Sequence, residues 1–122
     1  MKLRHLLLGG LLGLSGCNSE DKFSVDIGTG KIDYERFMSP NLFRTYDCRL
    51  TFADMNNNIK VYYDHNCNGT VDSVTINSQF YEGFYLVNTL GIDQSKLDDQ
   101  YKGLKADAFT MRKVQIQNEL GL

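Results

Sequence analysis

Residues 46–76, YDCRLTFADMNNNIKVYYDHNCNGTVDSVTI, decide the fold of this chain of 122 residues. Apolar and polar side chains alternate over 46–52 and again over 59–63, which predicts two strands with one apolar face each. The Val, Thr and Ile of 71–76 predict a third strand. The Asn-rich stretch 54–58 is typical of a turn, and connections this short join neighbouring antiparallel strands. We therefore expect an antiparallel meander here.

The apolar spacing changes after Ser78. Large apolar side chains over 80–90 recur at helical intervals and are followed by Gly91, a typical helix C-terminus. A second helix is expected from about residue 95, opened by a Ser95–Asp98 capping box. Residues 107–120 fit either a continued helix or an edge strand, and we favour the helix. The expected fold class is α+β, with an antiparallel sheet of about three strands followed by C-terminal helices.

Charge and composition narrow the function. The chain has 13 basic and 15 acidic residues, so no basic surface for nucleic acid is expected. The sequence holds two His and no G-x-S-x-G motif, which leaves few candidates for nucleophilic or acid–base catalysis. We expect a binding or structural protein and not an enzyme.

The N-terminus has the features of an export signal. A short basic start is followed over 6–14 by Leu and Gly only, too short for a membrane span of about 20 residues but suited to a signal peptide. The stretch Leu14-Ser15-Gly16-Cys17 resembles the lipobox of bacterial lipoproteins. That resemblance implies lipidation of Cys17, a palmitate-type anchor in membrane lipid and a place in the cell envelope. By the same resemblance, Asn18 after the cysteine favours the outer membrane, facing the periplasm, if the cell is Gram-negative. An ordinary signal peptide with an incidental Cys17 is the alternative.

The chain then divides into three parts. Residues 1–16 are the expected lipoprotein signal peptide, and residues 17–31 the lipidated N-terminus and flexible tether, with a frayed strand at 23–27. Residues 32–122 are expected to form a single small globular domain.

Two cysteines remain beyond Cys17. Export would place Cys48 and Cys67 in an oxidising compartment, where a pair of thiols normally forms a disulfide. A hairpin folded about Asn56 would bring Cys48 close to Asp64, a few residues from Cys67. The alternative is a zinc site made by the two thiols with His65 and Asp64. That site would need reduced thiols and lacks a C-x-x-C motif.

The stretch from Asp64 to Asp72 has the spacing D-x-N-x-N-G-x-x-D. It resembles the EF-hand-like calcium loops found on β-hairpins of extracellular proteins. By that resemblance the calcium ligands are Asp64, Asn66, Asn68, Thr70 through its carbonyl, and Asp72. Thr75 stands where an EF-hand has its bidentate Glu, so we expect weak binding. The alternative is a plain turn, because Asn68-Gly69 forms hairpin turns without a metal.

Two functions fit these features. The first is a membrane-anchored envelope lipoprotein with a structural or accessory binding role, stabilised by calcium, that contacts an envelope protein. The second is a periplasmic interaction or inhibitor module. Tyr46 and Cys48, followed by the strand at Val61 and Tyr63, resemble periplasmic lysozyme-inhibitor lipoproteins, although the C-terminal loop of that family is absent here.

Overall fold

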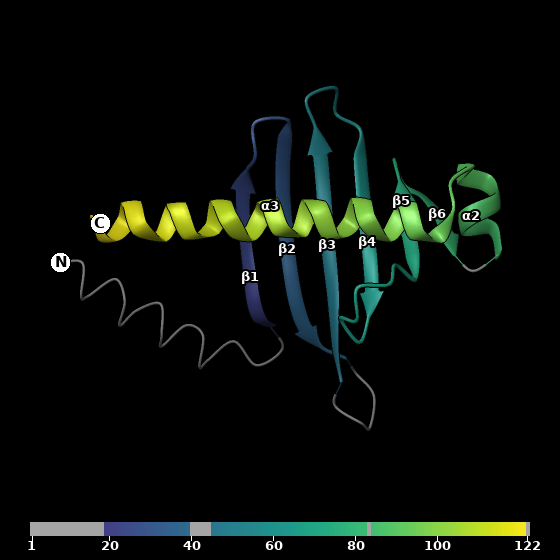
Figure 1. Ribbon diagram of the computed structural model, residues 1–122, viewed down its shortest axis with the longest axis horizontal. Coiled ribbons are helices and arrows are strands. Elements are labelled where there is room, and N and C mark those ends of the chain that lie inside the picture. The colour runs from purple at the N-terminus through teal and green to yellow at the C-terminus, as the bar shows by residue number, and fades with distance from the viewer. Residues whose placement is uncertain (1–18, 40–44, 83, 122) are drawn as a thin grey trace.

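A computed structural model describes residues 19–39, 45–82 and 84–121 (Figure 1). Six strands form one antiparallel sheet in chain order, followed by two helices. The elements are β1 Ser19–Asp26, β2 Gly30–Met38, β3 Tyr46–Asp54, β4 Ile59–His65, β5 Ser73–Ile76, β6 Gln79–Glu82, α2 Phe84–Leu90 and α3 Gln94–Leu120. The α+β prediction is confirmed, but the sheet has six strands instead of about three. The predicted signal peptide and Cys17 lie outside the described residues.

One of the additional strands, β1, comes from the stretch 17–31 expected to be mainly a tether, and β2 begins at the end of that stretch and continues into the expected domain. β1 pairs with β2 from Asp21↔Arg36 to Asp26↔Lys31, so the sheet begins at residue 19. Gly28 makes the tight connection with φ +90°, and its N–H donates to the Asp26 carboxylate at 2.8 Å. In β1 the exposed Lys22, Ser24 and Asp26 alternate with buried side chains, and this polar content also suits a solvated linker.

The sixth strand replaces the start of a predicted helix. Asn77 and Ser78 have φ of 48° and 75°, and two consecutive positive φ values favour a two-residue hairpin turn. β6 therefore pairs back onto β5, with Phe80 opposite Thr75. The predicted helix over 80–90 is correct only from Phe84 onward, because α2 is limited to Phe84–Leu90.

α3 is a single helix of 27 residues, so the helical prediction for 107–120 is confirmed. Its N-cap is Asp93, whose side chain accepts a hydrogen bond from the Lys96 N–H at 2.8 Å, and not the predicted Ser95. The helix ends at Gly121 in a left-handed conformation. A good cap four residues before the first buried side chain of the helix, Leu97, explains this start.

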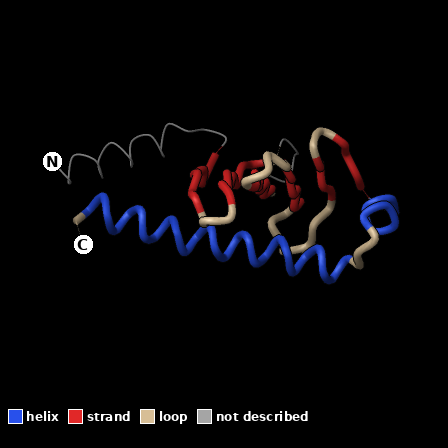
Figure 2. Tube along the Cα trace, turned by 90° about the horizontal axis from the view of Figure 1, so that it is seen from above, coloured by secondary structure: helices blue, strands red, loops and turns tan. Residues whose placement is uncertain are grey.

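The molecule has two layers, the sheet and α3. The helix runs across the strands along one face of the sheet, and α2 lies beyond β6 (Figures 1 and 2). We call the face against α3 the covered face and the opposite one the open face. The covered face holds the sheet part of the core, and α3 adds buried side chains at helical spacing. These core residues are Phe23, Val25, Ile32, Tyr34, Cys48, Leu50, Tyr62, Val74, Leu97, Tyr101 and Ala108.

The first strand packs against the second half of α3 in this core. The ring of Phe109 in α3 packs edge-on against Phe23 in β1, with ring centroids 5.2 Å apart. Nearby, the Gln115 side-chain amide donates to the Ser24 carbonyl at 3.3 Å. α3 therefore joins the first strand to the last segment of the chain.

Candidate functional site

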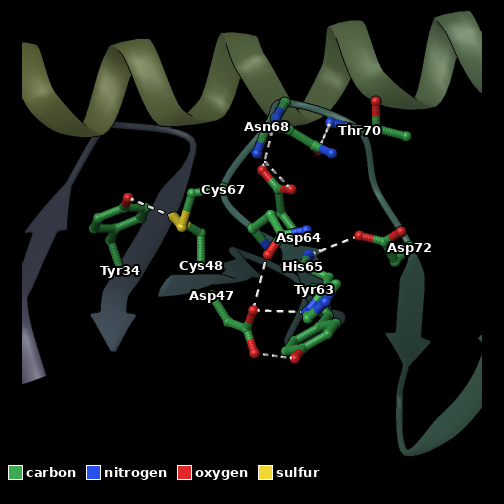
Figure 3. Close-up of a disulfide and its surroundings, with 12 residues drawn as sticks. Tyr34, Asp47, Cys48, Tyr63, Asp64, His65, Cys67, Asn68, Thr70 and Asp72 are labelled. Atoms are coloured by element: carbon green, nitrogen blue, oxygen red, sulfur yellow. Dashed lines mark hydrogen bonds and ion pairs between the residues drawn. A yellow bond between two sulfur atoms is a disulfide. The ribbon is translucent and has the colours of Figure 1, made fainter. Parts of the chain in front are cut away.

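The predicted disulfide is present and joins β3 to the loop after β4 (Figure 3). The Cα atoms of Cys48 and Cys67 are 5.1 Å apart. Cys48 pairs with Asp64 across the hairpin, as the fold about Asn56 predicted, which carries Cys67 into reach. Tyr34 lies beside the bridge, with its hydroxyl 3.1 Å from the Cys48 sulfur. Both thiols are used by the bridge, which removes the zinc alternative.

The loop after β4 is shaped by side chains that accept from its own backbone (Figure 3). The two oxygens of Asp64 accept from the N–H groups of Asn68 and Gly69, at 3.1 and 2.9 Å. Asn68 in turn accepts from the Thr70 N–H at 2.9 Å. Gly69 has φ +90°, the left-handed conformation that favours glycine at this position. The loop therefore bends sharply at Gly69, as a calcium loop with glycine at this position and a plain Asn68-Gly69 turn both require.

The two carboxylates of the predicted calcium site have different surroundings. Asp64 is fully buried under α3, whereas Asp72 is exposed and accepts from the His65 N–H at 2.6 Å. Asn66 is exposed at the tip of the loop. All five predicted ligands are oxygen donors, the chemistry that calcium prefers. Among the described residues, no group of three or more His, Cys, Asp or Glu could hold a metal.

The surroundings of Asp64 disfavour the charged form of its carboxylate. Burial raises its pKa, and the N–H groups of Gly69 and Asn68, the Tyr101 hydroxyl and the charge of Lys105 only partly oppose this. Tyr101 is itself fully buried, and its hydroxyl has no hydrogen bond of normal geometry among the described residues. Burial and the nearby charge of Asp64 raise the pKa of Tyr101. Asp64 and Tyr101 thus form a buried polar pair on the covered face, surrounded by packed side chains and only partly satisfied by hydrogen bonds.

Asp47 forms a second polar cluster on the open face (Figure 3). Its carboxylate accepts from the Tyr63 hydroxyl at 2.5 Å and from the Asn66 N–H at 3.1 Å, and it lies 2.8 Å from Nδ1 of His65. Burial raises the pKa of Asp47, but these hydrogen bonds, one from Ser39 and the charge of His65 outweigh it and leave the pKa below its usual value. Burial and the bond to Asp47 raise the pKa of Tyr63 to about 12.

The open face also carries a hollow of about 420 Å³ over β3 to β6. We call it the open-face hollow. Its lining combines apolar and aromatic side chains with three charged ones: Arg49, Val61, Tyr63, Asp72, Ser73, Thr75, Phe80 and Glu82. Phe80 is the most prominent of them, with 58% of its surface exposed. Large apolar groups exposed in a concave site favour ligand or partner contacts.

Three features of the open face are not predicted from the sequence: the buried Asp47, its hydrogen bond with Tyr63, and the open-face hollow. The signal was present, because strand alternation places Asp47, Arg49 and Tyr63 on the face opposite to Cys48 and Leu50. Linking them to Phe80 and Glu82 required β6, which was predicted as part of a helix. The hollow was therefore hidden by the missing strand.

Comparisons with protein-family models, with curated proteins and with solved structures find no match to this chain. Within the ranges that the structure describes, no helix is long and apolar enough to cross a membrane.

Proposed function

We propose that this chain is a lipid-anchored protein of the cell envelope, with a non-catalytic binding role carried by the open face of its sheet. The observation that carries the binding role is the uncovered face, with its hollow and the exposed Phe80. The anchor rests on the lipobox-like sequence ending in Cys17 and on the basic and apolar segment before it. The Cys48–Cys67 disulfide supports export, because such bridges persist in oxidising compartments.

The binding role is tested by photo-crosslinking in cells. A photoreactive amino acid at Phe80 should capture an envelope protein. The same group at Gly103, exposed on α3, is the control. Capture from residue 103 alone, or from neither position, would remove the open face as the binding surface. The anchor is tested separately with Cys17→Ala, which should leave an unprocessed or soluble protein. Unchanged membrane fractionation and unchanged N-terminal mass would contradict lipidation.

An inhibitor of periplasmic partners is the second candidate. The exposed aromatic side chain and the disulfide-linked sheet support it, because a rigid surface with an aromatic anchor suits a protein interface. Addition of the purified protein to a lysozyme assay tests this directly. Undiminished lysozyme activity at excess protein would exclude the lysozyme-inhibitor version.

Calcium remains part of the proposal as a stabilising ion on the loop from Asp64 to Asp72. The spacing of five oxygen donors and the left-handed Gly69 support it. Each carboxylate already accepts backbone hydrogen bonds, so the ion would use their remaining lone pairs. This keeps the expected affinity in the weak range of extracellular modules, about 10⁻⁴ to 10⁻³ M.

A further inference from the structure

We propose that the open-face hollow binds an arginine or lysine side chain presented by a cationic segment of a protein partner. The proposal rests on the binding role proposed above for the open face and names the chemistry of its partner. Three features of the hollow support this ligand: the arrangement of its apolar and acidic side chains, its unbalanced charge, and its aromatic side chains.

The strand register separates the hollow into an apolar part and an acidic part. Val61 pairs with Thr75, and Thr75 pairs with Phe80, so these three side chains form one row across the open face. The next row along the strands pairs Ser73 with Glu82, and Asp72 directly precedes Ser73. Phe80 and Glu82 are two residues apart on one strand, about 7 Å. That is the span of a long basic side chain lying along an apolar surface with its charge at the far end.

The charges around the hollow are unbalanced. Arg49, the cation that lines it, already forms an ion pair with Glu35. Among the described residues, neither Asp72 nor Glu82 has a cationic partner. Asp72 accepts only a backbone N–H, from His65. A ligand cation placed at this end would therefore gain two carboxylates without displacing a cation of the protein.

The aromatic walls favour the same ligand. Tyr63 lines the hollow in the same cross-strand row as Ser73 and Glu82, and its aromatic face attracts a guanidinium or ammonium group placed at the acidic end. Arginine suits this combination best, because its planar group stacks on a ring and pairs with a carboxylate at its edge. An anionic or purely apolar ligand would leave Asp72 and Glu82 unpaired.

The test uses the full chain, extracted in detergent with its N-terminus intact, and short fluorescent peptides. One peptide carries a single Arg between two Leu residues, and its matched partner carries Gln in place of Arg. We expect the Arg peptide to bind about fivefold more tightly, the sum of one exposed ion pair and one exposed cation–π contact. Added salt should reduce that preference.

Matched variants locate the effect. Glu82→Gln should remove most of the preference for Arg, and Phe80→Ala should weaken both peptides. Glu119→Gln, an exposed acidic residue on α3, changes the net charge equally and should have no effect. Equal binding of the Arg and Gln peptides, no binding of either, or an unchanged preference in Glu82→Gln would overturn the proposal.

Two further results distinguish a failure of the cationic ligand from a failure of the open face as the binding surface. Crosslinking from Phe80 to a partner without a cationic surface would leave the binding face in place and refute its chemistry. Displacement of the peptide by detergent micelles containing phosphatidylethanolamine, but not by micelles containing phosphatidylglycerol, would show that the hollow takes a lipid amine, which also refutes a protein partner.

Discussion

Asp47 and Asp64 are both almost completely buried at the same end of the β3–β4 hairpin, yet they lie on opposite faces of the sheet. On the open face, hydrogen bonds from Tyr63, Asn66 and Ser39 and the charge of His65 outweigh the cost of burying Asp47, and its pKa is lowered. On the covered face, burial under α3 outweighs the two N–H donors of Asp64, and its pKa is raised. The covered face is thus organised by packing, and the open face by polar contacts.

The largest expected effect contrasts one apolar side chain from each face. Leu50 is fully buried against α3, and Leu50→Ala should lower the free energy of unfolding by about 2–5 kcal/mol through lost burial and a residual cavity. Phe80→Ala on the open face should change it by about 0.5 kcal/mol or less, because the side chain is already mostly in water. Urea unfolding of both variants measures this. Similar losses for the two would mean that the open face is also part of the core.

Loss of the disulfide should have the next largest effect on the free energy of unfolding. Replacing both Cys48 and Cys67 by Ala should lower the free energy of unfolding by about 3 kcal/mol, because the unfolded chain regains the entropy of an open loop. Unfolding with and without dithiothreitol should reproduce this difference in the wild type. The double variant serves as the control, since reductant should not change its stability. A reductant effect that persists in the double variant would point to another cause.

The two aspartates predict opposite responses to pH. A lowered pKa in the folded state means that Asp47 stabilises the fold above about pH 4, the unfolded value, and that this is lost as the pH falls through the folded pKa. Asp47→Asn should cost about 1–3 kcal/mol at pH 7 and much less at acid pH.

A raised pKa has the reverse sign, so charged Asp64 opposes folding as the pH rises through its folded pKa. Asp64→Asn loses one of the two oxygens that accept backbone N–H groups, and this loss applies at every pH. Beyond that constant loss, the substitution should lower the free energy of unfolding more at acid pH than at pH 7. Unfolding curves between pH 3 and pH 8 test both variants. Parallel pH profiles for the two would contradict the contrast between the faces.

The smallest expected change in stability comes from calcium binding to the loop from Asp64 to Asp72. At ten times its dissociation constant, calcium would stabilise the fold by about 1.4 kcal/mol, and the melting temperature should rise in millimolar calcium and fall again with chelator. Asp72→Ala is the informative variant, because Asp72 is exposed, whereas Asp64→Ala would also disturb the core. Glu119→Gln controls for net charge. Identical melting of wild type and Asp72→Ala at every calcium concentration would leave the loop as a plain Asn-Gly turn.

The sequence predicted the parts of the fold whose signal is local. Alternation predicted β3 and β4, and the Val, Thr and Ile of 71–76 predicted β5. The hairpin about Asn56 placed Cys48 near Asp64, which made the disulfide expected from the two remaining thiols geometrically reasonable. β1 was largely missed because only Phe23 and Val25 mark its buried face, among charged residues that suit a linker equally well. β6 was missed because Phe80 also fits the helical spacing of α2, and only the Asn77-Ser78 turn separates the two.

Of the candidate site, only the loop from Asp64 to Asp72 and its disulfide could be predicted from the sequence. Strand alternation could have grouped Asp47 with Tyr63, but it could not show that Asp47 is buried while it faces away from α3. The hollow depends on four neighbouring strands being in register, a long-range property that no local pattern contains. Burial of Asp64 likewise depends on α3, about 30 residues later in the chain.

The order of the elements has a consequence for the newly made chain. All six strands are synthesised before the helix that covers them, and the contact of Phe23 with Phe109 joins the first strand to a late part of α3. Until that helix is made, the apolar side chains of the covered face have no second layer to pack against. A premature stop within α3 would release a sheet whose apolar face invites aggregation.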